Sequence, residues 1–228
     1  MTTPALIFDL DGTLVDTAPD LLGALNDVLQ SAGRPPVDLA DLRHLVGFGA
    51  RSMMAEAFKM TGGPAEPEQL DRYMHGFLSH YSAHIADYSR PFPGVEETLD
   101  ALRDQGARMG VLTNKPHDLT LLLMSKLKLD HYFVSIFGQG RMEYTKPDGR
   151  IFQDVVREVG GAGTGAVMIG DSVTDVQTAR NGGAPVVLLS YGYTPVPARE
   201  LGADVVVDDF REVPAALRRL AGRAKLPA

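Results

Sequence analysis

The stretch A-L-I-F-D-L-D-G-T-L-V-D, residues 5–16, constrains the fold of this chain most strongly. Its first four residues are apolar, and a short apolar run that ends in turn residues is typical of a fully buried strand in a parallel sheet. Asp9 and Asp11 follow directly, and Gly12 permits a sharp turn of the backbone. Because ligands bind beyond the carboxyl ends of parallel strands, this stretch predicts a polar site at one edge of a sheet.

Two structures are compatible with the paired aspartates. Side chains at i and i+2 share a face while the chain is extended, so Asp9 and Asp11 can enter one pocket. Alternatively, the residues form an Asx-type turn with both carboxylates in solvent. A calcium loop of the D-x-[DN]-x-[DN]-G type is excluded, because Gly12 comes too early and no glutamate follows at the required position. The remainder of the chain decides between a site and a turn.

The composition restricts the class of protein. A chain of 228 residues with 44% hydrophobic and 22% charged residues is typical of one large globular domain or two unequal ones. The net charge of -7 argues against a nucleic-acid-binding surface. The absence of cysteine excludes disulfides, thiolate metal ligands and a cysteine nucleophile. Without a signal-peptide pattern or an apolar span of membrane length, we expect a cytoplasmic protein with no membrane partner.

Residues 17–89 have the pattern of helices without strands. Apolar residues recur at helical spacing, and Gly-Pro clusters separate the segments. We predict helices from residue 18 to just before Gly33, and over 38–46, 51–60 and 67–86. Since this segment begins directly behind the aspartates, we expect an inserted helical cap domain over 17–89 that can fold over them.

Strands and helices alternate from residue 90 onward. Strands are predicted at 108–112, 133–137, 166–170, 185–189 and 204–207, and helices at 95–105, 116–127, 148–159, 173–181 and 213–221. Such alternation predicts right-handed βαβ units and an α/β fold with a doubly wound parallel sheet, formed by residues 1–16 and 90–228. No G-x-G-x-x-G follows the first strand, which argues against a dinucleotide site.

Polar residues stand where this sheet should have its open edge. Thr113 ends one strand, Lys146 precedes a helix, and Asp171 follows the strand A-V-M-I-G with Asp175 one helical turn later. Each residue alone also fits a structural role, such as a strand-end cap, a solvated lysine or a helix N-cap. Together with the first two aspartates they would place four carboxylates in one cleft, and their repulsion calls for a divalent cation. Oxygen ligands and a substrate phosphate favour Mg²⁺, with Lys146 and Thr113 holding phosphate oxygens.

The motifs D-L-D-G-T, V-L-T-N, K-P and G-D-S-V-T-D, in this order, resemble the four signature motifs of the haloacid dehalogenase superfamily. The similarity covers the whole chain and includes a helical cap inserted after the first motif. It is greatest to the phosphoglycolate phosphatase branch, whose cap loop is similar to V-G-F-G-A-R at residues 46–51. The resemblance implies a Rossmann-like core and phosphoryl-transfer chemistry.

It also implies a role for the residues that handle the phosphoryl group. Asp9 would be the nucleophile that forms an aspartyl-phosphate, and Asp11 would protonate the leaving alcohol and then deprotonate the attacking water. Thr113 and the Asn114 backbone N–H would bind phosphoryl oxygens, while Lys146 balances the charge of the intermediate.

The implied metal ligands are the carboxylates of Asp9 and Asp171 and the main-chain carbonyl oxygen of Asp11, with Asp175 bound directly or through water. Arg51 in the cap is a candidate for gripping a substrate carboxylate, and a surface salt bridge is the alternative for this residue.

The resemblance therefore predicts a Mg²⁺-dependent phosphatase for a small phosphorylated metabolite, with 2-phosphoglycolate as the first compound to test and a monomer or homodimer as the assembly. A phosphomutase of the β-phosphoglucomutase type is the nearest alternative, followed by a phosphatase for another metabolite or a nucleotide monophosphate. From a different class, the chain could be a catalytically silent phosphate-binding regulator. A haloacid dehalogenase is disfavoured, because that branch lacks an acid at the position of Asp11 and needs no metal.

Overall fold

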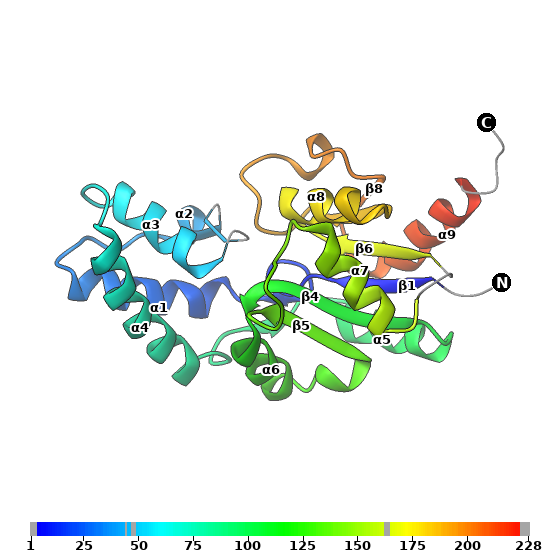
Figure 1. The fold of residues 1–228 in the computed structure, drawn as a ribbon, viewed down its shortest axis with the longest axis horizontal. Helices are drawn as coiled ribbons and strands as arrows, with labels where there is room; N and C mark the ends of the chain where they lie inside the picture. The colour runs from blue at the N-terminus through cyan, green and yellow to red at the C-terminus, as the bar shows by residue number, and fades with distance from the viewer. Residues whose placement is uncertain (1–3, 44, 47–48, 162–164, 224–228) are drawn as a thin grey trace.

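A computed structural model describes residues 4–43, 45–46, 49–161 and 165–223 of the chain (Figure 1). Six strands form one parallel sheet in the order β5-β4-β1-β6-β7-β8, which confirms the predicted doubly wound fold. The strands are β1 (Ala5–Phe8), β4 (Arg108–Pro116), β5 (Ser135–Gln139), β6 (Ala166–Gly170), β7 (Val186–Leu189) and β8 (Val205–Val207).

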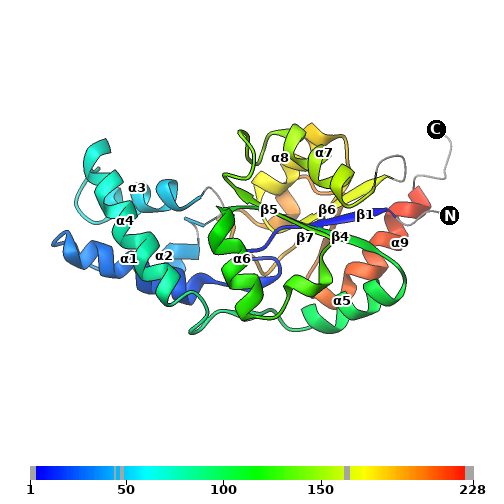
Figure 2. The same cartoon turned by 60° about the horizontal axis from the view of Figure 1, so that its bottom comes forward.

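Helices cover both faces of this sheet (Figure 2). They are α5 (Val95–Asp104), α6 (His117–Lys126), α7 (Gly149–Glu158), α8 (Val173–Gly182) and α9 (Val213–Arg223), with short 3-10 helices at Asp130–Tyr132, Ala198–Glu200 and Phe210–Glu212. Strand β1 lies in the centre, and its side chains alternate between two cores. Ala5 and Ile7 pack in the cluster that includes α7 and α8, whereas Leu6 and Phe8 pack in the cluster that includes α5 and α9. This two-sided burial explains why β1 is continuously apolar.

Four helices form a cap beside the sheet, as the sequence predicts (Figure 1). They are α1 (Ala18–Ser31), α2 (Leu39–Arg43), α3 (Ala50–Met60) and α4 (Pro67–Ala83). The apolar stripe of α1 is buried against α4, and both helices contribute to the larger hydrophobic core. Helix α4 ends three residues earlier than predicted, at a turn in which the His84 ring pairs with the Asp87 carboxylate. No helix among the described residues is long and apolar enough to cross a membrane.

Strand β4 differs from the prediction in a way that shapes the site. The predicted strand ends at Leu112, whereas β4 continues to Pro116. The added residues stay in the sheet because Pro116 pairs with Gln139 of β5, after a shift of register that follows Leu112. The segment from Thr113 to Lys115 therefore remains extended, and α6 begins at His117, one residue after the predicted helix start. As a result, Thr113 and Lys115 occupy i and i+2 positions of one strand.

A second, two-stranded sheet joins the cap helices to the main sheet, and no pattern in the sequence predicts it. β2 (Val15–Asp16) precedes α1, β3 (Arg90–Pro91) follows α4, and the two pair antiparallel. Next to this pair, the buried Asp20 of α1 accepts hydrogen bonds from the backbone N–H groups of Tyr88 and Ser89 and from the Ser89 hydroxyl, at 2.6 to 3.2 Å. The cap boundaries at 17 and 89 stay a prediction, which the position of this pair supports.

The Asp20 contacts yield a prediction for stability. Asp20→Ala leaves two backbone N–H groups and a hydroxyl without their acceptor, so we expect the free energy of unfolding to fall by about 2–4 kcal/mol. Asp27→Ala, which removes an exposed carboxylate from the same helix, is the matched control and should cost less than about 1 kcal/mol. Urea unfolding followed by circular dichroism measures both free energies. Equal losses would show that the hydrogen bonds of Asp20 to Tyr88 and Ser89 do not stabilise the fold.

Candidate active site

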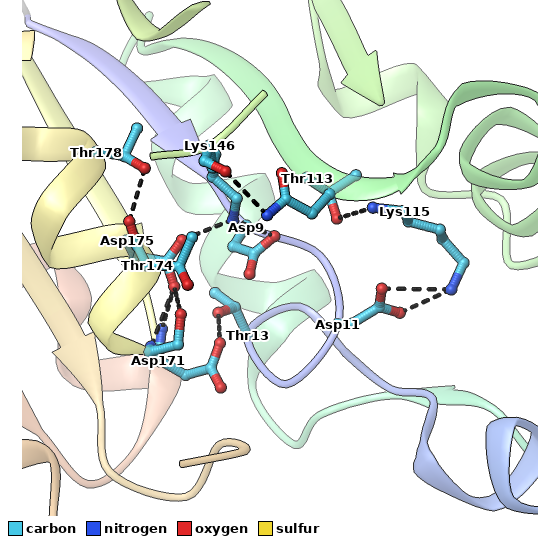
Figure 3. Close-up of polar contacts among 12 residues, drawn as sticks. Asp9, Asp11, Thr13, Thr113, Lys115, Lys146, Asp171, Thr174, Asp175 and Thr178 are labelled. Carbon is cyan, nitrogen blue, oxygen red and sulfur yellow. Dashed lines mark hydrogen bonds and ion pairs between the residues drawn. The ribbon is translucent and has the colours of Figure 1, made fainter. Parts of the chain in front are cut away.

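Three adjacent strands bring the predicted residues to one edge of the sheet. Phe8 of β1 pairs in register with Val111 of β4 and with Ile169 of β6. Asp9, Thr113 and Asp171 come one or two residues after this level on the three strands, and Lys146 reaches the same edge from the segment between β5 and α7 (Figure 3). Carboxyl ends of parallel strands meet at one edge, which is why residues far apart in the chain converge here.

Three carboxylates form a buried cluster at this edge. Oxygens of Asp9, Asp171 and Asp175 lie within 4.8 Å of one another, and all three residues are buried. Burial raises the pKa of Asp9 to about 7, against the opposing effect of Lys146 and with a further increase from Asp175. Burial and the charges of Asp175 and Asp9 hold the pKa of Asp171 well above its usual range. Burial and mutual repulsion therefore oppose the simultaneous ionisation of these carboxylates, and a bound cation would remove that opposition.

The ammonium of Lys146 lies between two of these carboxylates. Its Nζ is 2.7 Å from Asp175 Oδ1 and 2.9 Å from Asp9 Oδ1. Burial alone would lower the pKa of Lys146, but Asp175 and Asp9 raise it above its usual value, so the group stays charged. The other oxygen of Asp175 accepts hydrogen bonds from the backbone N–H groups of Asp171 and Ser172 and from the Ser172 hydroxyl. Both oxygens of Asp175 are thus engaged by protein donors.

Asp171 is fixed by groups from two other segments. The Thr13 hydroxyl donates to Asp171 Oδ1 at 2.8 Å, and the Tyr193 backbone N–H donates to Oδ2 at 2.6 Å. Gly12 has φ +84°, and a Cβ there would lie 2.6 Å from Asp171 Oδ2. Glycine is required at position 12 for both reasons, since a side chain would be strained and would also displace Asp171.

The carboxylate of Asp11 does not join the cluster, contrary to the expectation of four converging carboxylates. It points away from Asp9 in Figure 3 and contacts Lys115 Nζ at 3.0 and 3.3 Å, while the Thr17 hydroxyl donates to it at 2.7 Å. The cause is the backbone, because the N–H groups of residues 13, 14 and 15 all reach back to the Leu10 carbonyl oxygen. The chain is therefore no longer extended at Asp11, and its carboxylate stays outside the cluster, although Asp9 and Asp11 both line the pocket at the sheet edge, as predicted.

Lys115 is a site residue that sequence reasoning missed. Its side chain is only 3% exposed, and burial alone would lower its pKa, but Asp11 and Tyr81 raise it above the usual value. The same i, i+2 rule that was applied to the aspartates could have found it, since Lys115 follows Thr113 on an extended strand. Its backbone N–H also donates to the Thr113 hydroxyl oxygen at 3.2 Å.

Arg51 lies apart from the other predicted residues. It forms an ion pair with Asp71, and the two side chains are 52% and 63% exposed. Arg51 is not among the residues that line the pocket at the sheet edge. Two residues of the 46–51 loop, 47 and 48, lie outside the described residues. A role of Arg51 in holding a substrate carboxylate stays a prediction without a supporting contact.

A small pocket lies between the sheet edge and the cap. Its cavity volume is about 50 Å³, and its floor is polar whereas its cap side is almost entirely apolar. Three buried polar atoms on its lining residues lack a hydrogen bond of good geometry among the described residues, namely Asn114 Oδ1, Tyr81 Oη and Asp9 Oδ1, the last of which forms the ion pair with Lys146. Buried polar atoms are rarely left unpaired without a reason, so the pocket is suited to a polar ligand. The lining residues are Asp9, Asp11, Leu21, Val46, Gly49, Ala50, Met53, Phe77, Leu78, Tyr81, Thr113, Asn114, Lys115, Pro116, Leu119 and Lys146.

Comparison with known proteins agrees with this geometry. The haloacid dehalogenase-like hydrolase family matches residues 6–189. The chain is 46% identical over 211 residues to a phosphoglycolate phosphatase of Caulobacter vibrioides, covering 92% of this chain and 89% of that protein. It is 43% identical over 215 residues to a phosphoglycolate phosphatase of Agrobacterium fabrum, covering 94% and 92%. The crystal structure of a predicted phosphoglycolate phosphatase from Haemophilus somnus 129pt superposes with a TM-score of 0.87 at 29% identity, covering 95% of this chain and 99% of that one. The chain belongs to the haloacid dehalogenase-like hydrolase family.

Proposed function

We propose that the protein is a Mg²⁺-dependent phosphatase that hydrolyses a small phosphate monoester, with 2-phosphoglycolate as the first substrate to test. The observation that carries this proposal is the convergence of Asp9, Thr113, Lys146 and Asp171 at one buried sheet edge. Relatives named phosphoglycolate phosphatase, similar over nearly the whole chain, support the choice of substrate. A cytoplasmic location and a monomeric or homodimeric assembly accompany the proposal as predictions.

The residues at the edge fit a magnesium ion. The donor set is made of carboxylate oxygens, which Mg²⁺ prefers, and Asp9 Oδ1 receives no hydrogen bond from any described residue although Lys146 forms an ion pair with it. Asp9, Asp171 and the main-chain carbonyl oxygen of Asp11 would hold the ion. Because its oxygens are already occupied, Asp175 would orient Asp171 and Lys146 or act through a water molecule. When bound, the ion would neutralise the cluster and stabilise negative charge on the phosphoryl oxygens.

The proposed reaction has two steps. In the first, an Asp9 carboxylate oxygen forms a bond to phosphorus as the ester oxygen leaves, and Asp11 gives the leaving oxygen a proton. In the second, Asp11 takes a proton from the water that attacks the aspartyl-phosphate, which releases inorganic phosphate and restores Asp9. Thr113 and the Asn114 backbone N–H would donate to the phosphoryl oxygens, and Lys146 would balance their charge.

Several contacts support these roles. The Thr113 hydroxyl oxygen accepts the Lys115 N–H, which leaves its own hydrogen for a phosphoryl oxygen. Lys115 and Thr17 hold the Asp11 carboxylate in place, so that the proton donor does not swing freely. The apolar residues of the cap would shield the aspartyl-phosphate from bulk water. The small pocket between sheet and cap suits an ester with few atoms beyond its phosphate.

The first test concerns the nucleophile. Asp9→Asn keeps the shape of the side chain but removes its nucleophilic charge, so we expect phosphate release to fall by at least about 1,000-fold with an unchanged circular dichroism spectrum. Asp27→Asn, on the exposed face of α1, is the control and should retain full turnover. Near-native phosphate release by Asp9→Asn would remove Asp9 from the role of nucleophile. Measuring free phosphate also separates hydrolysis from transfer to a second hydroxyl.

The second test concerns the metal. A chelator should abolish phosphate release, and added Mg²⁺ should restore it. Mg²⁺ at one hundred times its Kd should stabilise the fold by about 2.7 kcal/mol, which raises Tm by about 5–10 °C in a chain of this size. Asp171→Asn should lose most of this shift, whereas the control Asp104→Asn, whose side chain is 77% exposed, should keep it. A Tm that is indifferent to Mg²⁺ in the unmodified protein would contradict the proposed site.

A further inference from the structure

Besides Lys146, the described part of the pocket contains the buried ammonium of Lys115, which we have so far assigned only to the positioning of Asp11. Lys146 forms ion pairs with Asp9 and Asp175 of the carboxylate cluster. Lys115 lines the same pocket but lies beside Asp11, outside the cluster. An ammonium group has three N–H donors, and the two contacts of Lys115 to Asp11 are to the oxygens of a single carboxylate. The ammonium also lies beside Tyr81, so an anion bound here would be shared between Lys115 and the Tyr81 hydroxyl.

The cap contributes a matching donor. Tyr81 of α4 is buried, lines the same pocket, and stacks on Phe77 with the Lys115 ammonium 4.6 Å from the centre of its ring. Its hydroxyl has no hydrogen-bond partner of good geometry among the described residues. Burial raises the pKa of Tyr81 to about 12, although Lys115 opposes the shift, so the hydroxyl keeps its proton at neutral pH. A buried donor without an acceptor is costly, and a ligand acceptor would remove this cost.

We propose that Lys115 and the Tyr81 hydroxyl bind a carboxylate carried by the alcohol part of the phosphate ester. The enzyme would thereby select small phosphorylated hydroxy acids over uncharged esters of the same size. This inference rests on the proposed phosphatase function and deepens it, because it assigns the residues that recognise the part of the substrate beyond the phosphate.

The surroundings of the two residues favour a carboxylate over other groups. An ammonium beside a hydroxyl donor complements an anionic acceptor, and the Asp11 carboxylate offsets only one unit of the positive charge that Lys115 and Lys146 bring to the floor of the pocket. The cap side is apolar, as Leu21, Met53 and Phe77 show. Arg51, the other cation considered for this role, is paired with Asp71 away from the pocket. The cavity of about 50 Å³ places any second substrate group close to the phosphate, within reach of residues that line the same space.

The test compares two esters that differ only in this group. 2-Phosphoglycolate carries the carboxylate, and 2-hydroxyethyl phosphate replaces it with an uncharged CH₂OH. We expect the unmodified enzyme to prefer 2-phosphoglycolate. Lys115→Met removes the charge but keeps the length of the stem, and should lower kcat/KM for 2-phosphoglycolate about 10- to 100-fold more than for 2-hydroxyethyl phosphate. Most of this selective loss should be a higher KM, because the contact also exists in the ground state.

The comparison separates recognition from an indirect effect through Asp11. If Lys115 only positions Asp11, Lys115→Met lowers turnover of both esters by the same factor, and the proposal is wrong. Lys126→Met, an exposed lysine on α6, is the control and should change neither ester. If the unmodified enzyme releases phosphate from neither ester with Mg²⁺ present, the proposed phosphatase function is wrong for this substrate class. The proposed role of Lys115 and Tyr81 in carboxylate binding is then wrong as well.

Tyr81→Phe gives an independent variant should Lys115→Met not fold. It deletes only the hydroxyl and leaves the ring stacked on Phe77, so we expect a selective loss of about 3- to 10-fold for 2-phosphoglycolate. Tyr73→Phe, on the same helix but outside the pocket lining, is the matched control. An equal effect of Tyr81→Phe on both esters would overturn the role of the hydroxyl.

Discussion

The position of one ammonium group, that of Lys146, governs the arrangement of the whole site. Two buried carboxylates, Asp9 and Asp175, come from different parts of the chain and would repel each other without a cation between them. Lys146 compensates part of this repulsion and so permits β1 and the start of α8 to approach. The remaining excess charge, concentrated on Asp9 and Asp171, creates the demand for a divalent ion. Protein stability and metal binding are therefore linked through the same few oxygens.

Sequence reasoning succeeded where one physical rule determines the outcome. The apolar run of β1 must be buried on both faces, and the residues that follow buried parallel strands must lie at one edge of the sheet. The proximity of Asp9, Thr113 and Asp171 could therefore be predicted from the sequence. The cap was predictable for a similar reason, because helical periodicity without strand patterns persists between the first motif and the rest of the sheet.

Prediction failed where tertiary contacts decide a local conformation. The backbone around Asp11 turns back on the Leu10 carbonyl oxygen, and no rule of periodicity indicates this. Pairing with β5 keeps β4 extended through Lys115, and only two residues in each strand form the β2–β3 pair, too few to leave a pattern. Arg51 illustrates the limit of resemblance, because similarity of the loop motif does not determine where a long exposed side chain finds its partner.

The pocket has one wall from the sheet edge and one from the cap, and this division has an evolutionary consequence. Every group that we assign to phosphoryl transfer belongs to the sheet edge, whereas the described residues of the cap wall offer apolar surface and one hydroxyl, that of Tyr81. Gene duplication followed by drift in the cap helices alone would therefore redirect such an enzyme to a new alcohol and leave its reaction untouched. Lys115 is the exception, because it lies at the sheet edge. A substrate without a carboxylate would therefore require a substitution in the sheet as well as in the cap.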